Sequence, residues 1–200
     1  MNIAIVKYNA GNTRSVLCAL ARLGYEGVVT DDPKALENAD RVIFPGVGEA
    51  SSAMAYLRDK GLDQVLVNLK QPFLGICLGM QLMCAKSEEN ATKTLGIFDA
   101  PVLKFRLAPE YKVPHMGWNT LTCKQDSLFT GLSEKSWCYF VHSYYVPLSA
   151  HTIASTEYGG QAFTAILHKD NFYGCQFHPE KSAESGELIL KNFLEVLPCF

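Results

Sequence analysis

A cysteine between two glycines is the first candidate for chemistry in this sequence. Cys77 lies at the centre of GICLG (75–79), directly after an apolar run. This is the spacing of a nucleophile elbow with cysteine in place of serine, in which the glycines leave room for a sharp strand-to-helix turn. The start of the following helix favours a thiolate, and the backbone N–H of Leu78 is expected to face an oxyanion. The alternative is a small buried residue that only packs.

A histidine and a glutamate near the end of the chain offer the base that such a nucleophile needs. His178 ends an apolar run in GCQFHPEKS and is followed by Pro179 and Glu180. Because proline restricts the preceding residue to extended backbone, the side chains of His178 and Glu180 are expected to point the same way. The carboxylate would then fix the imidazole tautomer and stabilise the imidazolium. Without Cys77, the same residues would indicate a turn with a surface acid.

The remaining motifs are less specific. FPGVGEA (44–50) follows a predicted strand, and its two glycines could bring backbone N–H groups close to a bound substrate. A strand-ending turn is the alternative for this segment. The other four histidines are expected to be satisfied polar positions in or beside strands: His115, His142, His151 and His168.

Short apolar runs alternate with amphipathic segments in the first half of the chain. This order is typical of βα units, which build a parallel sheet covered on both faces. Strands are predicted over 2–6, 25–30, 41–46 and 71–76, and helices over 12–24, 31–40 and 49–70, the last with a break at Gly61. Sites in open parallel sheets form beyond the carboxyl ends of the strands, which is where Cys77 falls.

After about residue 95 the pattern changes to successive strands with turns between them. Strands are predicted over 96–105, 117–123, 137–146, 151–159, 163–170 and 172–178, and a last helix over 182–197. No repeat or linker divides the chain. We therefore expect residues 1–200 to form a single α/β domain with a central mixed, mostly parallel sheet flanked by helices.

Composition argues against several classes of partner. The 200 residues carry a net charge of −2 and are 48% hydrophobic and 19% charged, close to the globular average. Basic runs that could follow a nucleic-acid backbone are missing, and so is any apolar stretch of the roughly 18 residues needed to cross a membrane. The seven cysteines include no CxxC pair, which indicates reduced thiols in the cytoplasm. The sequence also lacks the closely spaced cysteines and histidines of a zinc site, and we expect neither a metal nor a cofactor.

Several motifs together resemble one family. GICLGMQ, PGVG and HPE, on a chain of βα order, resemble the class I glutamine amidotransferases, whose fold is flavodoxin-like. PHMGWN and HPEKS narrow the resemblance to the glutaminase subunits of imidazole glycerol phosphate synthase, in histidine biosynthesis. The resemblance covers nearly the whole chain. It implies hydrolysis of L-glutamine to glutamate and ammonia through a γ-glutamyl thioester on Cys77, with His178 protonating the departing ammonia and later activating water.

The resemblance also implies roles for residues to which spacing alone assigns none. The backbone of Val47 would join that of Leu78 in binding the oxyanion. Glutamine would be held by the loop and pocket residues Gly46, Gly48, Gln81, Glu89, Ser143 and Tyr144. Glu89 suits the α-ammonium group, although an acid in KSEEN could equally be a solvated helix end.

A partner is implied as well: a (β/α)₈-barrel cyclase subunit that forms a heterodimer with this chain and receives the ammonia. Because free ammonia in water would largely be protonated, the transfer is expected to be enclosed. The positions that match the interface or the ammonia passage are Asn12, Met116, Trp118, Asn119 and Lys181.

Three alternatives remain open from the sequence. One is a glutaminase subunit of another synthase, such as the anthranilate type. Another is a non-catalytic regulatory subunit with the same fold. The third is a general cysteine hydrolase or a redox-sensing thiol protein.

Overall fold

The computed structural model describes residues 1–9, 11–133 and 135–197, and its centre is an eight-stranded sheet. Five neighbouring strands are parallel and three antiparallel strands extend the sheet at one edge, so the predicted mixed, mostly parallel α/β sheet is confirmed. In spatial order the strands are β2 (Gly27–Thr30), β1 (Ile3–Val6), β3 (Arg41–Gly46), β4 (Phe73–Cys77), β14 (Phe172–Cys175), β13 (Gln161–Lys169), β12 (Thr152–Tyr158) and β9 (Thr122–Cys123).

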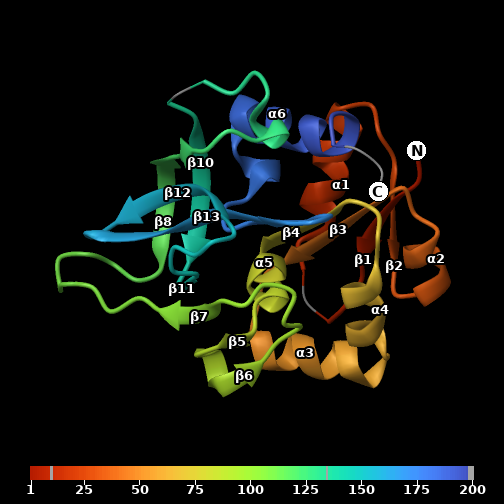
Figure 1. Ribbon diagram of the computed structural model, residues 1–200, viewed down its shortest axis with the longest axis horizontal. Coiled ribbons are helices and arrows are strands. Elements are labelled where there is room, and N and C mark those ends of the chain that lie inside the picture. The colour runs from red at the N-terminus through yellow and green to blue at the C-terminus, as the bar shows by residue number, and fades with distance from the viewer. Residues whose placement is uncertain (10, 134, 198–200) are drawn as a thin grey trace.

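Helices cover both faces of the parallel part of the sheet (Figure 1). One face carries α1 (Thr13–Arg22) and α6 (Ala183–Glu195); the other carries α2 (Pro33–Glu37), α3 (Ala50–Asp59), α4 (Leu62–Asn68) and α5 (Leu78–Met83). Because both faces are buried, the strands are apolar without interruption. In β1, Ile3 and Ile5 pack on the first face, and Ala4 and Val6 on the second.

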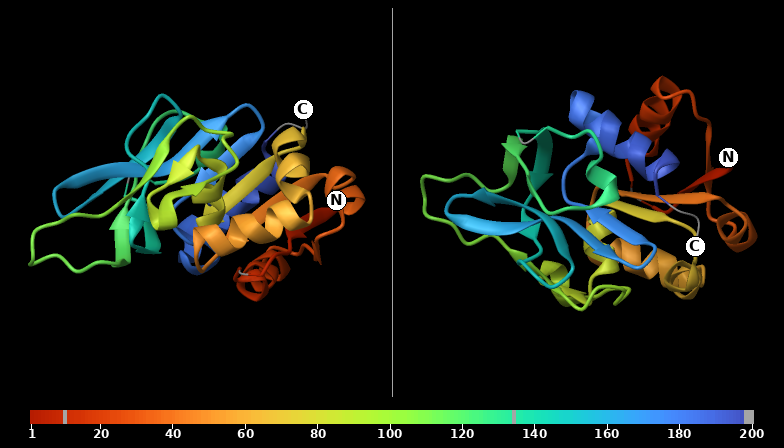
Figure 2. Two further views of the ribbon diagram at one scale, coloured as in Figure 1. Left: turned by 90° about the horizontal axis from the view of Figure 1, so that it is seen from below. Right: turned by 45° about the horizontal axis from the view of Figure 1, so that its top comes forward.

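Two smaller sheets lie beside the carboxyl ends of the parallel strands. One is an antiparallel ribbon of β8 (His115–Thr120) and β10 (Trp137–His142); the other contains β11 (Tyr144–Tyr145), β7 (Pro101–Lys104), β5 (Lys86–Ser87) and β6 (Thr92–Lys93). The connection between β7 and β8 projects from the body of the molecule (Figures 1 and 2). Three short 3₁₀ turns complete the described structure: η1 (Glu89–Ala91), η2 (Ser127–Phe129) and η3 (Pro179–Lys181).

Two of the predicted strands are each divided between sheets. The segment 117–123 separates into β8 and β9 around the buried side chain of Leu121, and β9 pairs with β12. The segment 137–146 separates at Ser143, because β11 leaves β8 and pairs with β7. The break predicted at Gly61 is confirmed: this glycine has φ 67° and separates α3 from α4. The short hairpin of β5 and β6 was not predicted.

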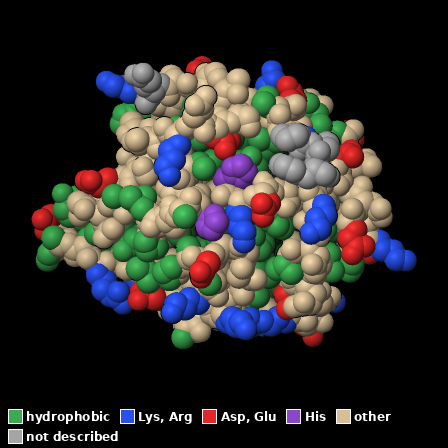
Figure 3. All heavy atoms as spheres, in the orientation of Figure 1, with side chains coloured by type: hydrophobic (Ala, Val, Ile, Leu, Met, Phe, Trp, Pro, Cys, Tyr) green, Lys and Arg blue, Asp and Glu red, His purple; other side chains and the backbone are tan. Residues whose placement is uncertain are grey.

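Charges of both signs are interspersed on the face shown in Figure 3. Among the described residues, none of the helices combines the length and the apolar character needed to cross a bilayer. The six cysteines of this part of the chain all carry free thiols, and Cys199 lies outside the described residues.

Candidate active site

The predicted elbow is present at Cys77. This residue ends β4 and precedes α5 with φ 53° and ψ −108°, a left-handed conformation that costs a non-glycine residue about 1–3 kcal/mol. Only 7% of Cys77 is exposed. The surrounding packing therefore stabilises a sharp turn that holds the sulfur at the carboxyl edge of the sheet.

The two glycines of the elbow are needed because α5 lies directly against the strands. A Cβ atom on Gly79 would lie 1.8 Å from the carbonyl oxygen of Phe44, in β3. A Cβ on Gly75 would lie 2.4 Å from the sulfur of Met83 and 2.8 Å from the backbone nitrogen of Met80. No rotamer change relieves a clash with backbone atoms, so the spacing of the motif follows from close packing.

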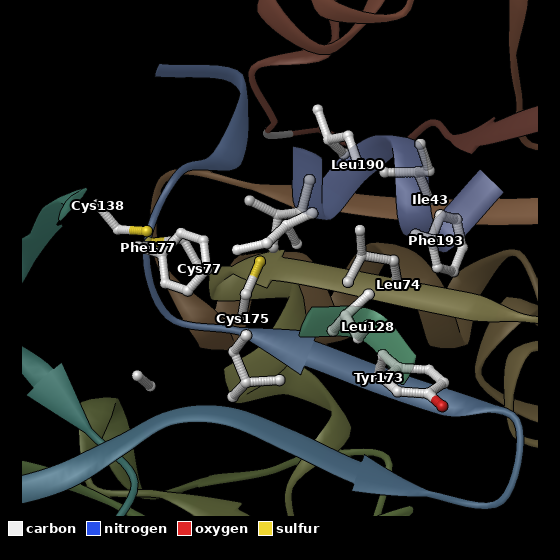
Figure 4. Packing of buried hydrophobic residues seen from close by; sticks show 14 of the residues in the cluster. Ile43, Leu74, Cys77, Leu128, Cys138, Tyr173, Cys175, Phe177, Leu190 and Phe193 are labelled. Atoms are coloured by element: carbon white, nitrogen blue, oxygen red, sulfur yellow. The ribbon is translucent and has the colours of Figure 1, made fainter. Parts of the chain in front are cut away.

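His178 lies at the same edge, because it follows β14, the neighbouring strand that runs parallel to β4. Figure 4 shows Cys175 and Phe177, which precede His178, in the same buried cluster as Cys77. Nδ1 of His178 lies 2.8 Å from Oε1 of Glu180, and both side chains are almost fully buried. Since a carboxylate only accepts, Nδ1 carries the hydrogen, and Nε2 is the basic atom of the neutral ring.

The Nε2 atom of His178 is buried and has no hydrogen-bond partner among the described residues. Burial lowers the pKa of His178, but the interactions with Cys77 and Glu180 outweigh burial and raise the pKa to about 10. An imidazole in this position readily holds a proton taken from a neighbouring thiol. The predicted grouping of Cys77, His178 and Glu180 thus exists as a compact buried cluster.

A pocket of about 320 Å³ opens onto Cys77 and His178. Most of the residues singled out from the sequence line it: Val47, Gly48, Cys77, Leu78, Gln81, Glu89, Ser143, Tyr144 and His178. Glu180 lies behind His178 rather than in the wall. Gly46 is also outside the wall; it pairs with Cys77 in the sheet, and a Cβ on it would lie 2.5 Å from the backbone nitrogen of Gly79.

The pocket also has wall residues that the sequence reasoning did not single out as ligands: Pro114, Val141 and His142. Nδ1 of His142 lies 2.7 Å from the carbonyl oxygen of Tyr144, and Nε2 lies 3.1 Å from Nδ1 of His115. Burial lowers the pKa of His142 to about 3 and that of His115 to about 4. Both rings are therefore neutral, hydrogen-bonded members of the strands, and their predicted structural role is confirmed.

Gln81 connects two walls of the pocket. Its Nε2 donates to the carbonyl oxygen of Tyr144 and to Oε1 of Gln176, at 3.0 Å each. Gln176 was missed in the sequence reasoning. The signal was available, because residues two apart in an extended segment face the same side, and Gln176 precedes His178 by two.

Carboxylates gather at the end of the pocket near α3. Oε2 of Glu89 accepts from the backbone N–H of Ala50 at 2.7 Å, and Glu49 caps the N–H groups of Ser51 and Ser52. Burial raises the pKa of Glu89, the Ala50 N–H opposes this, and the charge of Glu49 adds to it. A ligand with an ammonium group would find electrostatic stabilisation at this end of the pocket.

The residues matched to a partner interface lie outside the pocket, on three elements of the fold. Met116, Trp118 and Asn119 are on β8, and Lys181 is in η3, which contacts both β10 and α1. Asn12 is at the N-cap position of α1, where its side chain makes no capping hydrogen bond. Met116 is 63% exposed and Trp118 is 50% exposed.

The comparison with known proteins agrees with this geometry. The family model described as glutamine amidotransferase class-I matches residues 4–197. The imidazole glycerol phosphate synthase subunit HisH of Bacteroides fragilis is 58% identical over 98% of this chain and 100% of its own length. The corresponding subunit of Idiomarina loihiensis is 46% identical over the full length of both chains. The chain belongs to the class I glutamine amidotransferases, in the HisH family.

Solved structures of more distant members share the fold. A glutamine amidotransferase of 19% identity superimposes with a TM-score of 0.74 over 96% of this chain and 97% of its own. PurLQS from Thermotoga maritima, also 19% identical, gives a TM-score of 0.69 over 98% of this chain and 99% of its own. At this level of sequence identity, the superpositions show a shared α/β fold and nothing more.

Proposed function

We propose that this chain is the glutaminase subunit of an imidazole glycerol phosphate synthase, which hydrolyses L-glutamine to glutamate and ammonia and passes the ammonia to a cyclase. The observation that carries the proposal is the juxtaposition of a strained, buried Cys77 with the unpartnered Nε2 of a histidine whose Nδ1 is bound to Glu180. Membership of the HisH family supports the choice of synthase over the anthranilate type and over a redox thiol.

In the first half of the reaction, Sγ of Cys77 attacks the side-chain amide carbon of glutamine and its proton passes to Nε2 of His178. The C–S bond forms while the carbonyl electron pair moves to oxygen, and the N–H groups of Leu78 and Val47 stabilise that charge. His178 then gives its proton to the amide nitrogen. The C–N bond breaks, ammonia leaves, and the thioester remains on Cys77.

In the second half, His178 removes a proton from water, and the oxygen attacks the thioester carbon. The same N–H groups stabilise the second oxyanion. The C–S bond then breaks, His178 returns its proton to Sγ of Cys77, and glutamate leaves. Glu180 accepts the Nδ1–H bond throughout and stabilises the imidazolium that forms twice in each cycle.

The pocket residues divide between the two ends of the substrate. Glu89 would pair with the α-ammonium group, and the backbone of Gly48, Ser143 and Tyr144 would hold the polar groups along the chain. Gln81 would both position the backbone and bind the substrate. Its Nε2 donates to the carbonyl oxygen of Tyr144, and its Oε1 would accept a hydrogen bond from the substrate.

The cyclase would dock on the outer face of the β8–β10 ribbon. Cross-strand pairing places Trp118 opposite Tyr139 and Met116 opposite Val141, while the other face of the ribbon is buried. Trp137, 52% exposed, extends this apolar face and was missed from the sequence. Val141 also lines the pocket, so ammonia released at Cys77 would have a short path to the partner. An apolar face of this kind suits a heterodimer interface.

Two further proposals concern the chain as a whole. The free thiols favour a reducing compartment, and we propose the cytoplasm. The family match over residues 4–197 supports one domain over 1–200.

The decisive experiment replaces the nucleophile. In Cys77→Ala, glutamate release from glutamine should fall by at least about 10³-fold, because the thioester cannot form. Synthesis by the complex with supplied ammonium salt should stay close to that of the wild type. Cys18→Ala, at an exposed thiol on α1, is the control and should keep full glutamine turnover. Retained turnover in Cys77→Ala would exclude the proposed nucleophile, and a complex that never makes glutamate would support a non-catalytic subunit.

A further inference from the structure

Gln176 is a buried polar residue beside the nucleophile for which the catalytic scheme above has no role. Its exposed fraction is 0%, and it follows β14 directly. Its Oε1 lies 3.0 Å from Nε2 of Gln81, and its Nε2 lies 3.7 Å from Sγ of Cys77. A fully buried amide retains its place in a core only when both of its ends are satisfied.

The hydrogen bonds around Gln176 determine which way its amide points. The carbonyl oxygen of Tyr144 can only accept, so the atom of Gln81 beside it is Nε2, a donor. This same Nε2 also faces Gln176, whose contacting atom must then be the accepting Oε1. The NH₂ group of Gln176 is consequently directed at the sulfur.

We propose that Gln176 is a catalytic residue of the glutaminase site, whose side-chain amide donates a hydrogen bond to Sγ of Cys77 and stabilises the thiolate that attacks glutamine. Hydrogen bonds to a charged acceptor are roughly twice as strong as neutral ones. The inference deepens the proposed function and rests on Cys77 being the nucleophile.

The surroundings of the sulfur distinguish its two protonation states. A thiol can donate to the carbonyl oxygen of Val141, 3.8 Å away, whereas a thiolate can only accept, as the NH₂ group of Gln176 allows. The other titratable groups near the sulfur are His178 with Glu180 behind it, Tyr8 and Cys175. Of these, only the imidazolium favours a thiolate, so a neutral donor adds stabilisation without another charge to bury.

The test measures the reactivity of Cys77 without turnover. In the full-length chain, the Cys77 thiolate displaces iodide from iodoacetamide, forming an S–C bond as the C–I bond breaks; mass spectrometry of the peptide that contains Cys77 separates it from the exposed thiols. Gln176→Met keeps the length of the side chain and removes the donor. The pH midpoint of alkylation should rise by about one unit, so the rate at a fixed pH below both midpoints should fall about tenfold.

Gln71→Met is the matched control. It makes the same replacement just before β4, at the other end of this strand from Cys77. There the side-chain amide of Gln71 donates to the carbonyl oxygen of Leu36. Its alkylation midpoint should equal that of the wild type. If Gln176→Met does not fold, Gln176→Asn, whose shorter side chain withdraws the amide from the sulfur, decides the question in the same assay.

A folded Gln176 variant with the wild-type midpoint would overturn the proposal, because a purely structural residue changes stability without moving the titration of the thiol. This failure is distinct from failure of the proposed function. If Cys77→Ala still releases glutamate, the nucleophile is wrong; if Cys77→Ala is inactive and the midpoint does not move, only the role of Gln176 is wrong.

Discussion

Each side chain of the proposed catalytic triad has its orientation set by a local backbone feature. Cys77 is presented by the left-handed turn between β4 and α5. His178 is extended and precedes η3, and Glu180 lies within η3. Spacing made these three residues predictable, because a nucleophile elbow and a histidine–proline–carboxylate sequence each imply a local geometry. His142 was not assigned a pocket role, because a second histidine within an apolar strand belongs to no catalytic motif. Gln176 was missed although its spacing of two from His178 placed it on the same side of the chain.

Glu180→Gln tests the orienting carboxylate. Glutamine keeps the shape and can still accept from Nδ1 of His178, but it carries no charge to stabilise the imidazolium. We expect kcat for glutamate release to fall by about 10²–10⁴-fold, with a much smaller change in KM. Steady-state kinetics of the complex measure both values. A wild-type kcat would show that Glu180 has no electrostatic role, and an equal loss of the ammonia-driven reaction would indicate damage beyond the glutaminase site.

At the scale of the elements, the parallel half of the sheet was predictable and its antiparallel extension less so. Strands buried on both faces, such as β1 and β4, stand out as apolar runs between helices. The segments 117–123 and 137–146 are continuous in β propensity, yet each contributes to two sheets. Their breaks at Leu121 and Ser143 depend on which strand pairs with which, a long-range choice that local pattern does not contain.

A pH-dependent contact ties η2 to the end of β13. Both ring nitrogens of His168 face acceptors, Oδ2 of Asp126 at 3.0 Å and the carbonyl oxygen of Asp170 at 2.9 Å, so only the imidazolium satisfies both. Burial opposes this charge, but the two hydrogen bonds outweigh it and raise the pKa of His168. Burial likewise opposes the charge of Asp126, and the bond from His168 lowers the pKa of that carboxyl.

The directions of these two pKa shifts define the pH range in which the contact between His168 and Asp126 stabilises the fold. Because the pKa of His168 is raised in the folded protein, its stabilising contribution is complete below the usual pKa of 6.5 and is lost as pH rises through the folded-state pKa. Because the pKa of Asp126 is lowered, its contribution is lost as pH falls below the usual pKa of 3.8. Asp126→Asn, which can still cap Leu128, should therefore cost about 0.5–1 kcal/mol of unfolding free energy at pH near 5.5 and less near 9. Urea unfolding at both pH values measures the difference. The control Asp59→Asn, at an exposed position, should show no difference between the two pH values. Equal losses of unfolding free energy for Asp126→Asn at both pH values would contradict the ion pair.

At the scale of the whole molecule, the site lies where three sheets meet. The parallel sheet supplies Cys77, and His178 follows its strand β14. The small sheet with β7 and β11 supplies Tyr144, and the β8–β10 ribbon supplies Val141. The ribbon thus has one strand that lines the pocket and an outer face that is free to bind another protein. Docking on the ribbon would bring a partner next to the chemistry without covering the buried groups that perform it.

The proposed docking face carries two exposed tryptophans, Trp118 and Trp137. Trp118→Ala and Trp137→Ala should each raise the Kd for the cyclase by about 30-fold, since buried interface tryptophans commonly contribute about 2 kcal/mol. Titration with labelled cyclase measures the Kd. Val28→Ala, 66% exposed on the edge strand β2 at the far end of the main sheet, should leave it unchanged. Because neither tryptophan lines the pocket, saturating cyclase should restore wild-type glutamate release in both variants. An unchanged Kd in both tryptophan variants would place the cyclase on another face.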